Sequence, residues 1–259
     1  PQGQVNVIGT SFATHVEDII YPDGKPLQQT KIIVREGIVE WKSETQSSQR
    51  LTAGQTFTFP ATNERLEAVI KELVRLNPGY DGQYEAIEVD GHVRNLKIVG
   101  DMLVDISPLA DLPWLHMLDV SASDGRRGRL ANIEVLRSFK QLVNFSAHRQ
   151  NIRDLRPLAD ASSLIAILMN ANPIEDIGPL ATLPLEVLHL ADTPIGNLGV
   201  LAGKQLTEVN LLSTVIDELD LRPLQGAPLN RIWCKATTRE NLQVLRECRC
   251  LQTINDQNK

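Results

Sequence analysis

The sequence predicts a solenoid of the α/β class, in which short parallel strands alternate with helical turns. Five segments share the pattern L-x-x-L-x-L, in which L stands for an apolar residue. They begin at Leu142, Leu164, Leu185, Leu206 and Leu229, so successive units lie 21 to 23 residues apart. This period and this pattern are those of leucine-rich repeats. We therefore expect about seven repeats of 21–27 residues, forming a curved parallel sheet over residues 93–259.

Side-chain alternation explains why each unit needs its neighbours. In each strand the second and third apolar residues of the pattern point into the core, and the residues between them point outward. A single strand of this kind cannot bury its own apolar side, so stability comes from stacking the units. The first strand of the array is expected at Val93–Ile98 and the second at Leu115–Val120.

Polar residues recur after the strands. We expect Asp154, Asp176 and Asn197 to cap helical turns, which tolerate proline at their start. Four further residues stand three positions after successive strands and can bond the backbone of the neighbouring turn. These are Gln150, Asn172, Thr193 and Thr214. We interpret both sets as structural rather than catalytic.

Residues 1–60 have a different composition and predict a small all-β domain, truncated at its start. Short β-rich runs alternate there with glycines that are typical of turns. The runs are Gln4–Val7, Lys31–Val34, Ile38–Trp41 and Thr56–Phe59, and the glycines are Gly9, Gly37 and Gly54. Tyr21–Pro26 is expected to form a turn or loop.

Residues 61–92 predict a helical cap and connector. Thr62 or Asn63 can cap a helix over residues 61–77, which Asn77–Gly79 ends. Its apolar stripe comprises Leu66, Val69, Ile70, Leu73 and Leu76. This helix is expected to cover the open end of the solenoid, because terminal units must hide the edge of the core. Tyr84–Val89 is expected to add a strand.

The second repeat is longer than the others. Leu115 lies 27 positions before Leu142, and the surplus is residues 123–129. Insertions in solenoids form loops. Two interpretations stay open: a solvated, flexible loop, or a contact loop in which Arg126, Arg127 and Arg129 attract an anionic partner.

All three cysteines lie near the C-terminus. Cys234 is either a small buried residue of the last full strand or is paired with Cys248 or Cys250 in an oxidising compartment. A lone Cys-x-Cys is a poor zinc signature, so no metal is expected. A final helix is expected to carry Leu242, Leu245 and Cys248 along one stripe, and Leu251–Asp256 to close the array.

Composition narrows the classes of function. Hydrophobic residues make up 42% of the chain, enough for a sizeable core, whereas aromatic residues, at 4%, are too few for a stacking platform. A net charge of −6 and a pI of about 5.4 argue against nucleic acid as a partner. No run of 18 apolar residues exists to span a membrane. The chain starts without methionine or a signal-peptide layout, so we expect a fragment or processed form whose signal or anchor lies upstream.

No catalytic constellation stands out. Walker, Gly-x-Ser-x-Gly and His-Glu-x-x-His motifs are absent from the sequence. His148 and His189 both face outward but lie two strands apart, roughly 10 Å, which is too far to share a metal. We therefore expect no enzyme activity, cofactor or metal site. Clustered ionisable groups in a deep pocket would instead indicate a cryptic hydrolase.

The outward positions of the sheet are the expected binding surface, which we name the concave face. Seven strands at ~4.8 Å span about 30 Å, enough for a peptide or the edge of a protein. Leu168, Val187, Leu212 and Trp233 are apolar where solvent is expected, which often marks an interface. The alternative is that the β-domain, a flanking repeat or a second copy covers them. The expected contact residues are Asp119, Asn144, Ser146, His148, Leu168, Asn170, Val187, His189, Asn210, Leu212, Arg231 and Trp233.

Three motifs of the first domain occur in a recognisable order. They are Val7–Phe12 (VIGTSF), Lys31–Val39 (KIIVREGIV) and Leu51–Gln55 (LTAGQ). Over about 55 residues this part of the chain resembles the second half of a FecR-type domain, and the first half of that family is missing. The resemblance implies a place outside the cytoplasmic membrane and a role in relaying signals inward.

Four further motifs follow in the remainder of the chain. They are Leu76–Gly82 (LNPGYDG), Pro228–Cys234 (PLNRIWC), Asn241–Arg246 (NLQVLR) and Leu251–Asn255 (LQTIN). Residues 65–259 thereby resemble the extracytoplasmic leucine-rich-repeat tail of bacterial membrane serine/threonine kinases and related receptor-like proteins. The kinase motifs themselves are absent from the sequence.

These expectations converge on a non-catalytic module that binds a protein or peptide through the concave face. The resemblances imply the extracytoplasmic part, periplasmic or at the cell surface, of a membrane-anchored bacterial sensor or receptor-like protein. The alternative is a structural spacer or self-assembly domain without a ligand of its own.

Overall fold

The computed structural model describes residues 3–20, 26–43, 48–52, 56–58, 64–89, 92–214, 220–235, 238–248, 250–254 and 257–258. Its contacts divide the chain into two compact units. The N-terminal unit comprises Pro1–Ala68 and Glu88–His92, and the repeat unit comprises Val69–Ile87 and Val93–Lys259. The three-part division that the sequence suggests at residues 60 and 92 stays a prediction.

The N-terminal unit contains an antiparallel sheet built around one long hairpin. β1 (Gly3–Ile20) pairs with β2 (Pro26–Ser43). Two shorter strands, β3 (Ser48–Thr52) and β4 (Thr56–Thr58), also pair antiparallel with β2. The β-rich composition of this region therefore corresponds to a four-stranded sheet.

The expectation of turns at Gly9 and Gly37 was wrong. Both glycines lie inside the long strands β1 and β2, where the pairing shifts register between Ile8 and Ser11. Glycine inside a strand commonly marks such a bulge, because it has no side chain to pack and tolerates irregular backbone angles. Gly54 and Tyr21–Lys25 lie outside the described residues.

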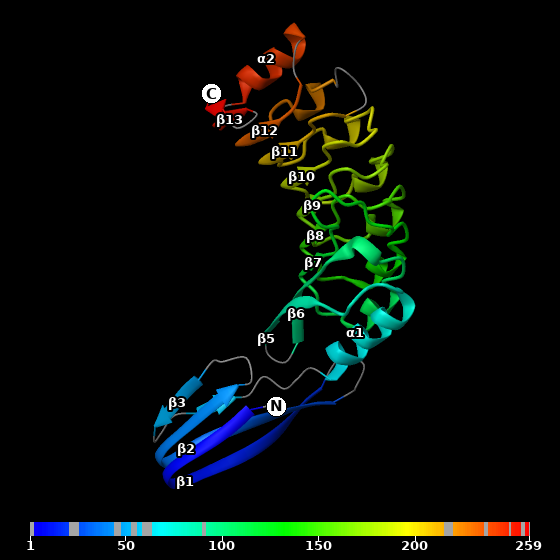
Figure 1. Ribbon diagram of the computed structural model, residues 1–259. Coiled ribbons are helices and arrows are strands. Elements are labelled where there is room, and N and C mark those ends of the chain that lie inside the picture. The colour runs from blue at the N-terminus through cyan, green and yellow to red at the C-terminus, as the bar shows by residue number, and fades with distance from the viewer. Residues whose placement is uncertain are drawn as a thin grey trace. The chain divides into compact units, whose positions relative to one another are not determined.

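The repeats form a second sheet whose strand order follows the sequence (Figure 1). Strands from β6 to β13 pair in parallel with their neighbours, and β14 pairs antiparallel with β13. The strands are β5 (Tyr84–Val89), β6 (His92–Ile98), β7 (Met117–Asp119), β8 (Asn144–Ser146), β9 (Ala166–Leu168), β10 (Val187–His189), β11 (Glu208–Asn210), β12 (Arg231–Trp233), β13 (Thr253–Ile254) and β14 (Gln257–Asn258). The predicted parallel sheet is confirmed, and β7 to β12 line the inner side of the arc in Figure 1.

Helical turns lie on the side of the repeats opposite the strands, and they are 3₁₀ rather than α. They are η1 (Gly100–Met102), η2 (Ser107–Asp111), η3 (Glu134–Ser138), η4 (Arg156–Leu158), η5 (Gly178–Leu180), η6 (Gly199–Leu201) and η7 (Arg222–Leu224). We name this side the outer face. Each of these turns has only three to five residues, and the 3₁₀ helix is the helical form that suits such short segments.

The core follows the repeat pattern. Phe145 in β8 and Ala147 directly after it are completely buried. The same holds for Ile167 in β9 and Met169 directly after it. Each pair brackets one outward residue, as alternation in a strand requires. The same inward positions are buried from Leu96 to Ile232, so the units share one continuous apolar core.

The predicted caps act from one residue before the N-cap positions of the 3₁₀ turns, which are Leu155, Ile177 and Leu198. The Oδ1 atoms of Asp154, Asp176 and Asn197 accept backbone N–H groups two residues later, at 2.9, 2.7 and 2.7 Å. This contact satisfies a donor at the start of each 3₁₀ turn. The same bond is made by Asp105, Asn132 and Asp220.

Three of the four predicted ladder residues, Gln150, Asn172 and Thr193, are buried between repeats, whereas Thr214 is only half-buried. Gln150 donates to the carbonyls of Gly100 and Val120 and accepts from the N–H of Leu130. Asn172 makes equivalent bonds one repeat later, including one from the N–H of Ile152. Thr193 donates to the Leu190 carbonyl. These side chains pair backbone groups that would otherwise be buried without partners.

Helix α1 (Glu64–Leu76) begins the cap of the array. Leu66, Val69, Ile70 and Leu73 are buried as predicted, whereas Leu76 is only half-buried. Beyond the helix, the Asn77 side chain donates to the Asp105 carbonyl at 2.8 Å and accepts from the N–H groups of Val104 and Asp105. These bonds tie the helix end to the first repeat. Thr62 and Asn63 lie outside the described residues.

Helix α2 (Arg239–Glu247) corrects one predicted stripe. Leu242 is 39% exposed, and the buried face instead comprises Asn241, Val244, Leu245 and Cys248. Asn241 is buried because its Oδ1 accepts the N–H of Leu221 at 2.9 Å, so a polar residue takes a core position. After the helix, β13 extends the sheet as expected.

The cysteines at this end are present as thiols. Cys234 is a buried residue next to β12, and burial raises its pKa to about 11. The Cys248 thiol donates to the carbonyl of Val244 at 3.3 Å. The interpretation of Cys234 as a small buried residue fits this arrangement.

The insertion is bonded to the solenoid at both ends. The backbone N–H of Ser123 donates to Asp101, and the N–H of Gly128 donates to the carbonyl of Arg149 at 2.8 Å. Arg126 pairs with Asp101 at 3.4 Å, and Arg127 reaches the Ala171 carbonyl. All three predicted arginines, Arg126, Arg127 and Arg129, are exposed.

Candidate binding face

Strand pairing places the predicted concave face in register. Residues of one column pair directly across successive strands, in the order Lys97, Asp119, Ser146, Leu168, His189, Asn210 and Trp233. Each of these side chains is exposed or half-buried. A second column runs beside it through Asn144, Ala166, Val187, Glu208 and Arg231. A third column, on the other side, comprises His148, Asn170, Ala191, Leu212 and Lys235.

The middle of this face is apolar. Leu168, Val187 and Leu212 are half-buried, which means that part of each side chain still contacts solvent. Ala166 and Ala191 beside them are buried, at 8% and 6% exposure, because their short side chains sit below their neighbours. The centre therefore comprises two small buried alanines and three partly exposed aliphatic side chains.

A linked cluster lies at the C-terminal end of the face. The Nε2 atom of His189 contacts Oε1 of Glu208 at 2.9 Å, and the other oxygen of Glu208 pairs with Arg231. The His189 and Trp233 rings meet edge to face at 5.9 Å, and the Arg231 guanidinium lies 5.8 Å from the Trp233 ring centroid. These four residues come from β10, β11 and β12. We name them the β10–β12 cluster.

Glu208 is the member of this cluster that the predicted contact residues omit. Its side chain is only 15% exposed and joins two predicted contact residues. The sequence contains a signal for it, because Glu208 and Arg231 occupy the same position of consecutive repeats. Opposite charges at paired positions of neighbouring strands attract.

Several predicted contact residues also form hydrogen bonds with backbone N–H groups or with neighbouring side chains. Asp119 and Asn210 accept N–H groups two residues later, and the Ser146 hydroxyl contacts that of Ser121 at 3.2 Å. The Oδ1 of Asn170 accepts the N–H of Ala191. Nδ1 of His148 accepts the N–H of Asn170 at 3.1 Å.

The two histidines of the face have separate roles. Burial lowers the pKa of His148, which favours the neutral ring that accepts this bond. His189 instead belongs to the β10–β12 cluster. Over the described residues, no three metal-ligating side chains lie together.

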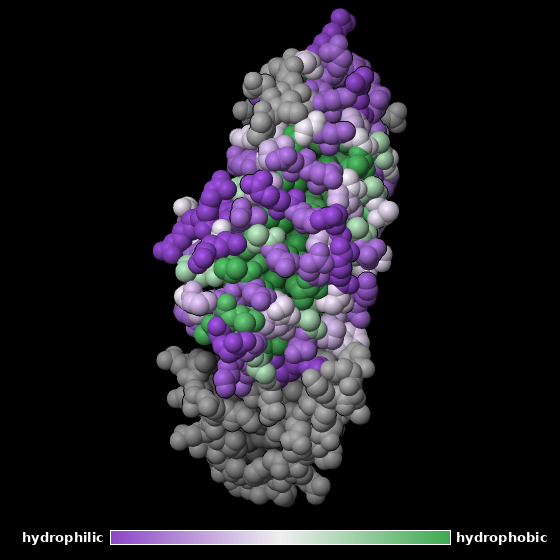
Figure 2. All heavy atoms as spheres, turned by 90° about the vertical axis from the view of Figure 1, so that its right-hand side faces the viewer, coloured by the Kyte–Doolittle hydropathy of each residue, from purple (hydrophilic) through white to green (hydrophobic). Residues whose placement is uncertain are grey.

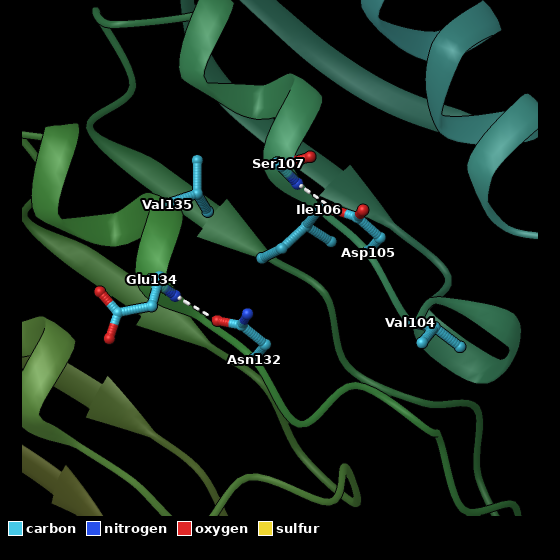
Figure 3. Close-up of a pocket in the computed structure, with 7 residues that line it drawn as sticks. All are labelled: Val104, Asp105, Ile106, Ser107, Asn132, Glu134 and Val135. Atoms are coloured by element: carbon cyan, nitrogen blue, oxygen red, sulfur yellow. Dashed lines mark hydrogen bonds between the residues drawn. The ribbon is translucent and has the colours of Figure 1, made fainter.

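Among the described residues, the outer face carries hollows but no cluster of three metal-ligating side chains. Figure 2 shows a broken apolar strip between polar side chains there. One hollow of about 410 Å³ is lined by residues of η2 and η3 (Figure 3). Its two capping side chains, Asp105 and Asn132, already accept backbone N–H groups at 2.8 Å. The polar groups of this hollow therefore serve the turns themselves.

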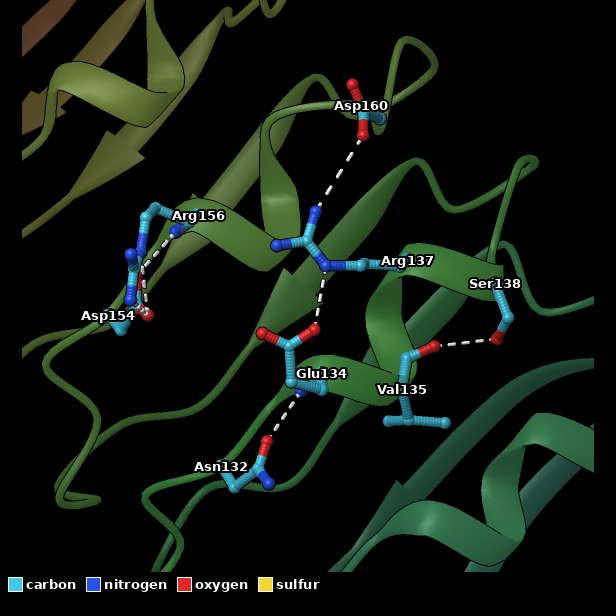
Figure 4. A network of polar contacts seen from close by, with 8 residues as sticks. All are labelled: Asn132, Glu134, Val135, Arg137, Ser138, Asp154, Arg156 and Asp160. Carbon is cyan, nitrogen blue, oxygen red and sulfur yellow. Dashed lines mark hydrogen bonds and ion pairs between the residues drawn. The ribbon is translucent and has the colours of Figure 1, made fainter.

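Ion pairs on the outer face lie within one turn or join neighbouring turns, as Arg137 does by also reaching Asp160 at 3.8 Å (Figure 4). Arg156 pairs with Asp154 at 2.6 Å, and Arg137 bonds Glu134 at 2.7 Å. Hydrogen bonding from Arg156 lowers the pKa of Asp154 to about 2. Such exposed pairs between near neighbours contribute little to stability.

No helix among the described residues is long and apolar enough to cross a membrane. The same part of the chain holds a solenoid whose parallel strands, 3₁₀ turns and buried polar ladder are those expected of leucine-rich repeats. Solenoids of this kind present extended concave surfaces to partners.

Comparison with known proteins supports the same fold. No family model matches the chain, and no curated protein matches it. Among solved structures, an internalin (inlF) from Listeria monocytogenes superposes with a TM-score of 0.53 at 25% identity, over 59% of this chain and 44% of that one.

Two further solved structures match less extensively. An internalin C2 (inlC2) from the same organism is 34% identical over 42% of this chain and 46% of its own, with a TM-score of 0.39. The leucine-rich-repeat ectodomain of the receptor kinase SOBIR1 from Arabidopsis thaliana is 17% identical over 58% of this chain and 91% of its own, with a TM-score of 0.37. The geometry and the first internalin together show that the chain has the leucine-rich-repeat fold.

Proposed function

We propose that this chain is a non-catalytic module that binds a protein or an extended peptide through the concave face. The observation that carries the proposal is the continuous, in-register face that joins an apolar centre to the β10–β12 cluster. Partly exposed aliphatic, tryptophan and arginine side chains are those that dominate binding energy at protein interfaces. The proposed contacts are the twelve residues predicted above, with Glu208 added.

The position of these side chains supports a role as anchors. Leu168 and Val187 stand beside small buried alanines, so a partner side chain can pack against them. Trp233 and Arg231 are oriented by their contacts with His189 and Glu208. Side chains held in place before binding lose less entropy when the partner arrives. The arginines at 126, 127 and 129 are proposed as a secondary contact loop.

We further propose an extracytoplasmic setting, periplasmic or at the cell surface, in a membrane-anchored bacterial sensor. Support comes from the FecR-like motifs of the first domain and from the resemblance of residues 65–259 to repeat tails of membrane kinases. The likeness to an internalin also favours a bacterial surface protein. The aligned region spans 44% of that internalin, so the activity of the whole internalin is not carried over.

The test compares matched variants on resin. Wild type, Leu168→Glu with Trp233→Ala, and a control with Val104→Glu are immobilised at equal density. Val104 is 44% exposed and lies outside the three columns of the face, so it receives the same carboxylate without touching the proposed surface. Proteins retained from extracts and secreted material are quantified by mass spectrometry, after thermal unfolding has shown that each variant folds.

We expect at least one protein to be retained by wild type and by the Val104 control but lost from the face variant. Equal retention on all three resins would contradict binding through the concave face. An isolated retained protein is then titrated against each variant by calorimetry, which separates specific binding from adsorption to the resin.

A structural or self-assembly role is the second candidate. One observation favours it: β5 is the terminal strand of its sheet, and Tyr84 and Ile87 on it are 40% and 57% exposed. An exposed apolar edge strand is a template for pairing with another chain. Sedimentation equilibrium of wild type and Ile87→Lys checks this role. A dimer that the substitution dissociates would favour assembly, and a monomer at all concentrations would exclude self-assembly.

A further inference from the structure

We infer that the surface of β9 to β12 recognises an extended segment that carries a carboxylate side chain three or four residues from an aliphatic one. The inference rests on the proposed function and names the chemistry of its partner. It follows from the hydrogen-bonding capacity of Arg231, the charge balance of the face and the spacing of its strands.

Arg231 is the receptor for the carboxylate. Its side chain is 52% exposed although Nη2 already pairs with Glu208. A guanidinium has five N–H donors in a rigid planar fork, which matches the two oxygens of a carboxylate. Glu208 on one side and the Trp233 ring on the other restrict the orientation of that fork. Arg231 is therefore preorganised and retains donors for a partner.

The surrounding charges favour an acidic partner. From β8 to β12 the three columns of the concave face contain one carboxylate, Glu208, and both of its oxygens are engaged by His189 and Arg231. Lys235, two residues after Trp233, is exposed and adds positive charge. Exposed Glu186 and Asp192 border these columns but lie outside them. A basic segment would therefore meet no available carboxylate within the columns, and it would approach Arg231 and Lys235 with like charge. Electrostatic complementarity of this kind selects partners and orientation.

Strand spacing sets the separation of the two anchors. Val187, Glu208 and Arg231 pair in one column, so Val187 lies two strands from Arg231. Leu168 lies three strands from Trp233 in the neighbouring column. At ~4.8 Å per strand these separations are about 10 and 14 Å. In a strand, side chains four residues apart face the same side and lie about 13 Å apart at ~3.3 Å per residue. In polyproline II, side chains three residues apart face the same side and lie about 9 Å apart at ~3.1 Å per residue. A segment in either extended conformation therefore covers one of these separations in three or four residues.

The experiment uses a random octapeptide library, acetylated at the N-terminus and amidated at the C-terminus so that terminal charges play no part. Wild type is panned against it together with Arg231→Gln, the charge exchange Glu208→Arg with Arg231→Glu, and Leu168→Glu. The control is Arg222→Gln, which removes an arginine that pairs with Asp220 on the outer face. Selected peptides are resynthesised and their Kd values are measured by fluorescence polarisation.

We expect wild type and the Arg222 control to enrich Asp or Glu three or four positions from Leu, Ile or Val. Arg231→Gln should weaken the best acidic peptide about 3- to 10-fold and abolish the acidic preference, since it loses a charge-assisted pair at a half-exposed site. The charge exchange should shift the preference to Lys or Arg at that position. This variant keeps an ion pair between the two strands, so its result does not depend on tolerance of Arg231→Gln.

Three results would overturn the inference. Enriched peptides that bind the face, lose affinity with Leu168→Glu, and show no acidic preference would refute the inference and leave the proposed function standing. An acidic preference that survives both Arg231 variants would refute the role of Arg231. If folded wild type enriches no peptide, or if Leu168→Glu changes nothing, the inference and its basis in the concave face fail together.

Discussion

The inner and outer faces of the repeat unit use polar side chains differently. On the outer face, Asp154 pairs with Arg156 and Asp220 with Arg222, two residues away in the same turn. On the concave face, Glu208 joins His189 and Arg231, which are 19 and 23 residues away on neighbouring strands. These two outer pairs need only their own turn, although the longer contact from Arg137 to Asp160 at 3.8 Å does join neighbouring repeats. The inner cluster exists only if consecutive repeats stack in register. A site built from long-range pairs depends on the whole array.

The largest expected effect on stability comes from removing the buried hydrogen bonds that join neighbouring repeats. Gln150→Ala removes three hydrogen bonds to backbone groups of Gly100, Val120 and Leu130, all at a buried position. We expect the free energy of unfolding to fall by about 3 kcal/mol, because buried backbone groups lose their partners. Urea denaturation measures it, with exposed Gln205→Ala as control. A change below about 0.5 kcal/mol would show that water replaces the side chain.

Charge coupling should separate the two faces directly. A double-mutant cycle on Glu208 and Arg231 is expected to give a coupling of about 1 kcal/mol or less, because Glu208 is largely buried but Arg231 is half-exposed. The same cycle on the exposed pair Asp220–Arg222 is expected to give no measurable coupling. Urea denaturation of seven proteins, the wild type and three variants for each pair, provides both cycles. Equal couplings would remove the proposed distinction between inner and outer pairs.

A smaller effect is expected where the chain leaves each strand for the outer face. Arg149, Ala171, Asp192 and Ser213 recur there with positive φ of 54 to 58°. An L-residue in this conformation is strained by roughly 1 kcal/mol, and glycine is not. Ala171→Gly should therefore stabilise the protein by up to about 1 kcal/mol. Thermal unfolding checks the sign, and a lower Tm than wild type would show that the lost side-chain packing outweighs the relieved strain.

The smallest expected effect is a change of stability with pH, to which one titratable residue on each face contributes. Burial depresses the pKa of His148, so below about pH 6.5 the unfolded chain binds more protons than the folded one. Stability must then rise with pH through this window and fall on acidification. His148→Gln, which can still accept the N–H of Asn170, should flatten the dependence of Tm between pH 7 and 5. An unchanged slope would mean that His148 does not contribute.

Asp154 provides the matching test on the outer face. Its folded pKa of about 2 lies below the ordinary value, so its contribution is present above about pH 4 and is lost as pH falls through 2. Asp154→Asn keeps the side-chain oxygen that accepts the Arg156 N–H but cannot titrate. The variant should lose less Tm than wild type between pH 5 and 2. A parallel decline would indicate that Arg156 stabilises the carboxylate equally in the unfolded chain.

Much of the repeat unit could be predicted from the sequence because its rules are local. The period placed the strands, and alternation within each strand identified the column from Asp119 to Trp233. Short polar residues before turns were correctly interpreted as caps, as Asp154 shows. These features depend on backbone geometry within one unit, which the residue pattern determines.

The predictions failed at positions whose structure depends on residues that are distant in the sequence. Leu242 faces solvent because Asn241 takes the buried side of α2 through a bond to Leu221, twenty residues earlier. Gly9 and Gly37 sit in a bulge rather than turns, because the hairpin of β1 and β2 continues past them. In each case a polar or flexible residue has a role that only its distant partner reveals.

The sequence alone therefore determined the repeat, the orientation of its strands and which side chains face outward, since period and alternation act within a few residues. Only the tertiary structure decided that Glu208 links His189 to Arg231 beside Trp233. Those contacts depend on the distance between stacked strands and on side-chain orientation. Both are set by how one repeat packs on the next, and no single repeat determines them.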